Sequence, residues 1–484
     1  MNLYKKLAIQ TIIYSIGFAL PKIINYVFLK FFTIVFKREE FSLYTDMYAL
    51  SFIVIGFLSF GLENTYFRFL YKKNCNKEIV FSTGVIIQLL ISSFFLIISI
   101  FLTKNLSSIA GYYHHPEYFL MFFLIIFFDT ICILPMAWLR VNDKPIQYSI
   151  INIVNVLVQS FLIIFLFLYS KNSLFFSIFF MRWINSFTDK IGYIFFANMI
   201  SSLINLFLIF PIFLKKVTIK KFNKDLAIKM LSYGIPIMIG TISFSINENL
   251  DKILIKRCIS DEINGAYSAC YKIASFMSLY IKVFRLGIEP FFFKKSKDSD
   301  AIYYYEEIIY IFILFGLIFY VLICGNINMF MRFLIEKKYH IAIPIIPIIM
   351  MGNLFLGIYT NLSIFYKIID KPIIGTYISL IGMLITFLFN VIFIFISTNN
   401  SFMIPAWGTF TSYGSMLIVL YIWGKKFFLQ FCNKKITNII IHFIFALFIV
   451  FMIKREIKLN FLLQILYLII ILFLERNRLK NLIK

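Results

Sequence analysis

Eight charged side chains within long apolar segments are the residues most able to do chemistry. The basic ones are Lys22, Lys272, Lys282 and Arg285, and the acidic ones are Asp46, Asp129, Glu248 and Asp251. An ionised group near the centre of a bilayer costs at least about 2.5 kcal/mol unless it meets a cavity or a partner. Because Arg and Lys pair well with phosphate oxygens, the basic set predicts a hydrated cavity for an anionic substrate. The acidic set supplies several candidates for carrying a proton or a sodium ion and does not single out one of them.

The spacing of these charges places several of them on common helix faces. Glu248 and Lys252 stand at i and i+4, which allows an ion pair, and Asp251 shares their face. Lys282 and Arg285 share a face of the next predicted helix. For residues near the ends of apolar segments, snorkelling to the membrane interface or a structural ion pair is the alternative, and these residues are Lys30, Glu63, Lys272 and Glu289.

The elements that must position these residues are transmembrane helices. Of the 484 residues, 61% are hydrophobic and 14% are charged, which is more apolar surface than a soluble core can bury. The apolar runs are continuous and close to the roughly 20 residues that a helix needs to cross a bilayer. The breaks between them predict fourteen spans, near residues 8–35, 41–62, 80–103, 117–139, 146–170, 191–214, 229–250, 263–290, 304–325, 341–366, 373–397, 401–424, 437–453 and 459–474.

The distribution of basic residues predicts the orientation of these spans. The first span runs well past Pro21 and lacks a small-residue cleavage site, so we expect it to be retained rather than removed as a signal peptide. Placing the N-terminus in the cytoplasm puts most basic residues of the connecting segments on that side, including the dense stretch from Lys215 to Lys229. An even number of spans returns the C-terminus to the cytoplasm. We therefore expect a multi-pass protein of the bacterial cytoplasmic (inner) membrane, whose basic loops contact membrane lipid.

An internal repeat divides the chain into two halves. The sequence Asp-Lys-Pro follows the fourth span at residues 143–145 and the tenth span at residues 370–372, a displacement of 227. A second match pairs Gly61 and Glu63 with Gly287 and Glu289. Two halves of six spans share one orientation, and such parallel repeats in secondary transporters are related by an axis along the membrane normal. We expect a bundle over 1–214, a cytoplasmic basic linker over 215–228, a second bundle over 229–426, and two further helices with a basic tail over 427–484. The alternative to a transporter is a duplication that builds only a large scaffold.

Composition and motifs argue against several other functions. The net charge of +24 would suit nucleic-acid binding in a soluble protein, but the basic residues lie between apolar runs, where the membrane explains them. The six cysteines are scattered singly and the four histidines lack ligand spacing, so we predict neither a disulfide framework nor a metal site. The sequence contains no nucleophile with a base, phosphate loop or ATP-binding signature, which predicts a secondary transporter without a cofactor rather than an enzyme.

The chain resembles the polysaccharide flippases of the multidrug/oligosaccharidyl-lipid/polysaccharide exporter superfamily, which also contains the lipid II flippase. The resemblance rests on the fourteen spans in two halves, the two Asp-Lys-Pro turns, and the segments Gly61 to Arg68, Asn247 to Lys252, Gly265 to Lys272 and Gly287 to Pro290. It implies an all-α, V-shaped pair of six-helix bundles with a C-terminal helix pair. It also implies a flippase that works by alternating access, alongside other polysaccharide-assembly proteins. Its cargo would be an undecaprenyl-diphosphate-linked oligosaccharide, such as an O-antigen unit for lipopolysaccharide.

The resemblance also implies roles for particular residues. Lys22, Lys282 and Arg285 match in position the basic residues that the family places in its cavity. The seventh helix departs from the family pattern, because it presents two acids and a lysine between Glu248 and Lys252 rather than a lone cation.

Three alternative functions stay open at this point. A multidrug or cation exporter of the same superfamily usually has twelve spans and an acidic cavity, and the lipid II flippase would carry a different cargo. A membrane glycan polymerase or glycosyltransferase typically needs a large external loop or an acidic catalytic pair. The acidic pair of this chain, Asp298 and Asp300, lies beside lysines in a predicted cytoplasmic loop, which favours a solvated charge run.

Overall fold

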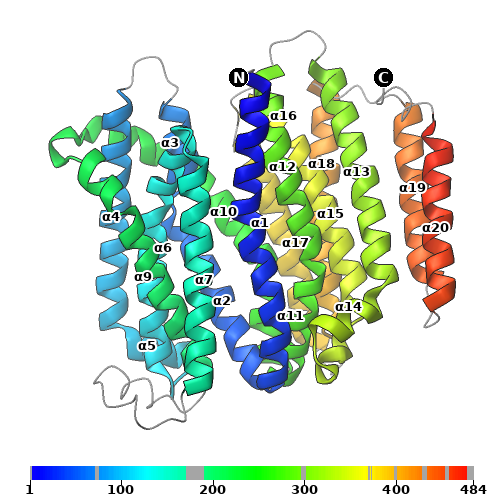
Figure 1. Ribbon diagram of the computed structural model, residues 1–484, viewed down its shortest axis with the longest axis horizontal. Helices are drawn as coiled ribbons and strands as arrows, with labels where there is room; N and C mark the ends of the chain where they lie inside the picture. Colours follow the sequence, from blue (N-terminus) through cyan, green and yellow to red (C-terminus); the bar gives the residue numbers. More distant parts are fainter. Residues whose placement is uncertain are drawn as a thin grey trace. The chain divides into compact units, whose positions relative to one another are not determined.

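The protein is helical throughout the part that the computed structural model describes. That part comprises residues 3–70, 76–169, 190–295, 301–368, 371, 373–396, 401–427, 433–452 and 457–476, and it holds no strand (Figure 1). Twelve helices within it are long and apolar enough to cross a membrane. The two remaining predicted spans correspond to α11 (Asp261–Ala274) with α12 (Phe276–Lys295), and to the shorter α20 (Ile457–Leu474). The predicted all-α membrane fold of about fourteen spans is confirmed.

Packing divides the chain into two units. Unit 1 comprises residues 1–24 and 47–245, and unit 2 comprises residues 25–46 and 246–484. Three helices contribute residues to both units, namely α1 (Leu3–Val35), α2 (Arg38–Leu58) and α10 (Lys224–Cys258). The segment 25–46, which joins α1 to α2, therefore packs with helices from the second half of the chain.

Unit 1 is a bundle organised around α6. The helices that lie entirely within this unit are α3 (Leu62–Leu70), α4 (Lys77–Phe101), α5 (Thr103–Ile109), α6 (Pro116–Val141), α7 (Pro145–Tyr169), α9 (Ile191–Lys216) and the short η1 (Ile219–Lys221). Helix α6 packs against α4, α7 and α9. One buried cluster joins α3, α4, α6 and the start of α10 through Tyr66, Phe81, Leu134 and Met230. This core packs against α6, the helix that carries Asp129.

Unit 2 is organised around α15. Besides α11, α12 and α20 it contains α13 (Ala301–Gly325), α14 (Ile327–Leu334), η2 (Lys337–Ala342), α15 (Ile345–Leu362), α16 (Ile364–Ile368), α17 (Ile373–Ile396), α18 (Met403–Phe427) and α19 (Asn433–Met452). Helix α15 packs against α11, α12, α13 and α18, and most of its apolar window is buried. Helices α19 and α20 pack together against α13.

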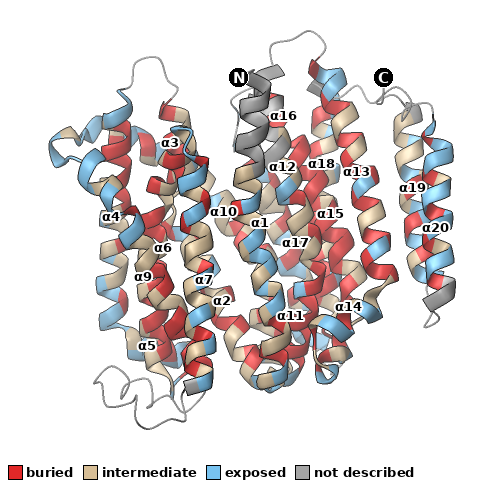
Figure 2. Ribbon diagram, viewed as in Figure 1, coloured by how far each residue is buried: buried red, intermediate tan, exposed pale blue. Residues whose placement is uncertain are grey.

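The outward faces of many helices are apolar. Figure 2 shows exposed residues along helices such as α4, α7, α19 and α20, and these include Phe94, Phe101, Leu168, Phe451 and Phe473. Apolar faces of this extent require lipid rather than water as their solvent. The chain is a multi-pass membrane protein.

The predicted sequence repeat and the packing units are different divisions of the chain. The units group residues by contact, whereas the boundaries 1–214, 215–228, 229–426 and 427–484 describe a duplication, which stays a prediction. The predicted basic linker is occupied by the end of α9, η1 and the start of α10. In the second Asp-Lys-Pro turn, Asp370 and Pro372 lie outside the described residues, as do Asp298 and Asp300.

Candidate functional site

Five of the eight predicted site residues lie together on three helices of unit 2. Glu248 and Asp251 come from α10, Lys272 from α11, and Lys282 and Arg285 from α12. Electrostatic interactions link Lys282 to both Glu248 and Arg285. They also link Lys272 to Lys252. The structure thus brings together the basic and acidic residues of unit 2 that the sequence placed on separate helices.

Helix α11 positions the aromatic residues of this site. It begins at Asp261 because the hydroxyl of Ser260 accepts a hydrogen bond from the Ile263 N–H at 3.2 Å, which is a helix N-cap. The helix ends before Ser275, which separates α11 from α12. Tyr267 and Tyr271 stand at i and i+4, so both phenol rings lie on the face of α11 that meets α10.

Two tyrosines hold the carboxylate of Glu248. The hydroxyl of Tyr271 donates to Glu248 Oε1 at 2.6 Å, and the hydroxyl of Tyr413, on α18, donates to Oε2 at 2.7 Å. Hydrogen bonds to an ionised group are short and strong, so they fix the position of this carboxylate. Glu248 is therefore held in a fixed position beside Lys282.

Asp251 and Lys252 form a buried ion pair next to Glu248. Lys252 Nζ lies 3.2 Å from Asp251 Oδ1, and Asp251 Oδ2 accepts a hydrogen bond of 2.6 Å from Tyr267. The ammonium group also lies 3.5 Å from the ring centroid of Tyr271 and contacts the main-chain carbonyl of Glu248. The predicted side-chain pair between Glu248 and Lys252 does not form here, because tyrosines bind the Glu248 carboxylate and Lys252 pairs with Asp251. The charges of Asp251 and Lys252 compensate each other.

The remaining cations of the site are accessible. Lys272 and Lys282 are exposed, and Arg285 is half-buried. Arg285 interacts electrostatically with Tyr366 of α16. Among the described side chains of this cluster, Asp251 and Lys252 balance each other, and the other basic residues, Lys272, Lys282 and Arg285, outnumber the one remaining acid, Glu248.

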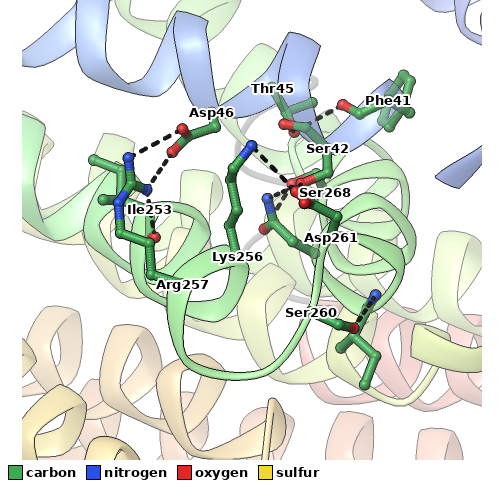
Figure 3. A network of polar contacts seen from close by, with 12 residues as sticks. Phe41, Ser42, Thr45, Asp46, Ile253, Lys256, Arg257, Ser260, Asp261 and Ser268 are labelled. Carbon is green, nitrogen blue, oxygen red and sulfur yellow. Dashed lines mark hydrogen bonds and ion pairs between the residues drawn. The ribbon is translucent and has the colours of Figure 1, made fainter. Parts of the chain in front are cut away.

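Asp46 belongs to unit 2 but lies in a different polar network, at the contact of α2 with the α10–α11 corner (Figure 3). Its carboxylate is fully buried and pairs with both terminal nitrogens of Arg257, with Oδ1–Nη1 at 2.9 Å and Oδ2–Nη2 at 3.3 Å. In the same network Asp261 accepts from Ser42 at 2.9 Å and lies 3.1 Å from Lys256 Nζ. These contacts attach residues 25–46 to α10 and α11. An ion-coupling role for Asp46 stays a prediction.

Lys22 and Asp129 belong to unit 1. Lys22 is exposed on α1, and its predicted share in the cationic cavity stays a prediction. Asp129 lies on α6, accepts a hydrogen bond from Ser202 of α9, and lines a cavity of about 310 Å³. The described residues contain no group of three or more His, Cys, Asp and Glu side chains that could hold a metal ion.

Sequence reasoning missed the residues that organise these charges. Tyr267 and Tyr271 could have been found, because their i, i+4 spacing places two phenols on one helix face. Tyr413 and Arg257 could not, since their partners Glu248 and Asp46 are separated from them by 165 and 211 residues.

Comparison with known proteins gives the family and the fold. The family model described as "Polysaccharide biosynthesis protein" matches residues 7–295. The solved structure of the lipid II flippase MurJ in an inward closed conformation has a TM-score of 0.71 and 18% identity, covering 97% of this chain and 100% of that chain. An inward-facing multidrug resistance transporter of the MATE family has a TM-score of 0.60 and 12% identity over 88% of this chain and 94% of its own.

A mutant of the Vibrio cholerae MATE transporter VcmN has a TM-score of 0.61 and 11% identity, covering 87% of this chain and 97% of its own. No curated protein matches the chain. At these identities the solved structures establish a shared fold, and the family model covers more than half of the sequence. The chain belongs to the polysaccharide biosynthesis protein family, with the membrane fold that MurJ and the MATE transporters share.

Proposed function

We propose that this protein is a flippase, not an enzyme, that moves a polyprenyl-diphosphate-linked oligosaccharide across the bacterial cytoplasmic membrane. The cargo passes from the inner to the outer leaflet by alternating access, and both termini of the protein lie in the cytoplasm. The observation that carries the proposal is the group of accessible cations, Lys272, Lys282 and Arg285, beside a fixed Glu248 carboxylate. The family and the fold shared with MurJ support this class of cargo.

The cationic site suits the diphosphate of such a carrier lipid. A guanidinium presents two parallel N–H groups to phosphate oxygens, and an ammonium adds a compact positive charge. In the absence of cargo, Lys282 interacts with the carboxylate of Glu248. A bound diphosphate competes for Lys282, while the tyrosines keep Glu248 in place. Glu248 thus limits how tightly the anion is held and helps its release.

Lys22 of unit 1 is a further cation of the proposed cycle, as the resemblance to the family implies. A proton or a sodium ion supplies the driving force, and other polysaccharide-assembly proteins deliver and take up the glycan. O-antigen units and other repeat units of envelope polysaccharides fit the same site, because the diphosphate is common to them.

The test is leaflet exchange of fluorescent undecaprenyl-diphosphate oligosaccharide in proteoliposomes. Removing one charge-assisted contact costs about 1.5–3 kcal/mol, so Arg285→Ala should lower the exchange rate on the order of 10- to 100-fold. Arg285→Lys should retain part of the rate, because it keeps the charge but not the paired geometry. Lys220→Ala, an exposed charge of η1 outside the site, is the matched control and should exchange like the wild type.

The same assay separates the alternative functions. Exchange of lipid II but of no shorter glycan would identify lipid II as the cargo. Efflux of organic cations without glycan exchange would identify a drug exporter. A folded Arg285→Ala variant that exchanges at the wild-type rate would refute the cationic site.

A further inference from the structure

The cavity of unit 1 follows one face of α6. Its lining residues on this helix are Asp129, Cys132, Ile133, Met136 and Arg140, a spacing of i, i+3, i+4, i+7 and i+11. Eleven residues of α-helix span about 16 Å. The cavity therefore runs from Asp129, midway along α6, to Arg140 in the last turn of the helix.

The far wall of this cavity is polar. It is formed by Tyr148 and Asn152 of α7 and Asn205 of α9. The side-chain oxygen of Asn205 is buried and has no hydrogen-bond partner among the described residues, and the same holds for Arg140 Nε. Buried polar groups of this kind are normally met by ordered water. A cavity of about 310 Å³ has room for on the order of ten waters at ~30 Å³ each.

The charges along the cavity are unevenly compensated. The titratable or charged groups that line it are Glu63 of α3, Asp129, Cys132 and Arg140 of α6, and Tyr148 of α7. Glu63 and Arg140 form an ion pair at the end of the cavity, where the Arg140 guanidinium also lies 5.1 Å from the ring centroid of Phe67. Asp129, at the other end, has no ion-pair partner among the described residues and accepts a hydrogen bond from Ser202.

The surroundings of Asp129 suit a proton better than a metal cation. Sodium and other hard cations require several oxygen ligands to replace their hydration shell. On α6 itself, the lining residues that follow Asp129 are Cys132, Ile133 and Met136, which offer sulfur and methyl groups, so among the described side chains neutral oxygen ligands for a cation come only from Ser202 and from the polar residues of α7 and α9. A carboxylate inside the membrane is costly to keep ionised, and taking up one proton removes that cost without further ligands.

We propose that Asp129 is a proton-binding site of unit 1, reached by water from the α6 C-terminal end through the cavity whose mouth is the Glu63–Arg140 pair. In the proposed orientation this mouth faces the cytoplasm. The inference rests on the proposed function for its role in transport, where inward proton movement through Asp129 drives the outward passage of the glycan. It selects one of the four acidic candidates, Asp46, Asp129, Glu248 and Asp251, as the coupling group.

The water path is tested by cysteine accessibility in a background that lacks the six native cysteines. Met136→Cys places a thiol on the cavity face of α6, and we expect it to react with a small charged thiol reagent applied from the cytoplasmic side. Leu139→Cys is the matched control, because Leu139 lies on the same helix but is fully buried in the protein core, and it should not react. Equal reactivity at the two positions would overturn the water path.

The proton site is tested by infrared spectroscopy of the purified protein during a pH change. A carboxylic-acid band should appear on acidification in the wild type, be lost in Asp129→Asn and shift in Asp129→Glu. A response of this band to sodium at constant pH, or a wild-type band in Asp129→Asn, would overturn the proposal. These readouts require no cargo, so they stand even if the wild type exchanges no glycan, which would refute the proposed function instead.

The last test of the proposal measures glycan transport. If the wild type exchanges glycan, an imposed pH gradient should accelerate it, Asp129→Glu should retain the response, and Asp129→Asn should lose it while remaining folded. A response to the gradient that survives in Asp129→Asn would assign the coupling to another acid.

Discussion

The ion pair between Asp46 and Arg257 should contribute more to stability than any exposed pair of the same network. Asp46 is fully buried, whereas Arg257 is 32% exposed. Removing one partner of a buried pair leaves a charge without compensation and costs about 3–5 kcal/mol. Because Arg257 is partly solvated, we expect the lower limit, about 3 kcal/mol, for Arg257→Ala. The pair Lys256–Asp261 offers an internal comparison, because Asp261 is 44% exposed and such pairs are worth about 0.2–1 kcal/mol.

The assay is a double-mutant cycle on reversible unfolding of the detergent-solubilised protein. Arg257→Ala alone should be strongly destabilising, and adding Asp46→Asn should recover a substantial part of the loss, because the buried charge is then gone. Lys256→Ala serves as the matched control and should change the free energy of unfolding by less than about 1 kcal/mol. The reasoning would be refuted if Arg257→Ala and Lys256→Ala were equally mild, or if the double variant were no more stable than Arg257→Ala.

Two further predictions concern how residues 25–46 attach to unit 2. A methyl group on Gly265 would clash with the main-chain carbonyl of Arg38, so Gly265→Ala should lower the thermal midpoint by the equivalent of about 1–3 kcal/mol. Gly414→Ala is the control, because its new Cβ meets only ordinary contacts, and it should leave the thermal midpoint unchanged. Glu336 lies between α14 and η2, and its pKa is lowered by the hydrogen bond and the positive charge of Lys30. The pair therefore stabilises the fold fully at pH values above the usual carboxyl pKa. This stabilisation is lost as the pH falls through the lowered pKa of Glu336. The stability difference between wild type and Lys30→Met should be constant near neutral pH and decrease in acid, leaving only the part that Lys30 contributes through the main-chain carbonyls of Arg332 and Ile335. A difference that grew on acidification would contradict the assignment.

Much of the fold could be predicted from apolar length alone. A bilayer forces each span to satisfy its backbone internally, so continuous apolar runs identify helices whatever their partners are. The division of the span 263–290 at Ser275 could not be foreseen, because no proline or glycine marks it. The packing of residues 25–46 with unit 2 is also invisible in the pattern, since it depends on contacts such as Arg38 with Glu262, 224 residues away.

The sequence indicates which charged residues belong to the candidate site but not which partners they contact. The cost of an ionised group in lipid identifies Glu248, Lys282 and Asp129 as residues that need a partner or a cavity. Helical spacing then proposes a partner on the same helix, which for Lys252 gave Glu248, whereas the structure uses Asp251. Spacing cannot rank such choices, because the carboxylates of both Glu248 and Asp251 also accept hydrogen bonds from tyrosines of other helices, among them Tyr413 of the distant α18.

The two units hold their acids in opposite ways, and this difference argues for separate tasks. Glu248 receives two tyrosine hydrogen bonds, one on each carboxylate oxygen, which hold it near Lys282. Any rearrangement of this carboxylate disturbs contacts with two helices, α11 and α18. Asp129 receives one hydrogen bond from Ser202 and lies on a cavity wide enough for water, so gaining or losing a proton there disturbs few contacts. In the proposed cycle the unit 2 acid therefore tunes anion binding, and the unit 1 acid exchanges protons.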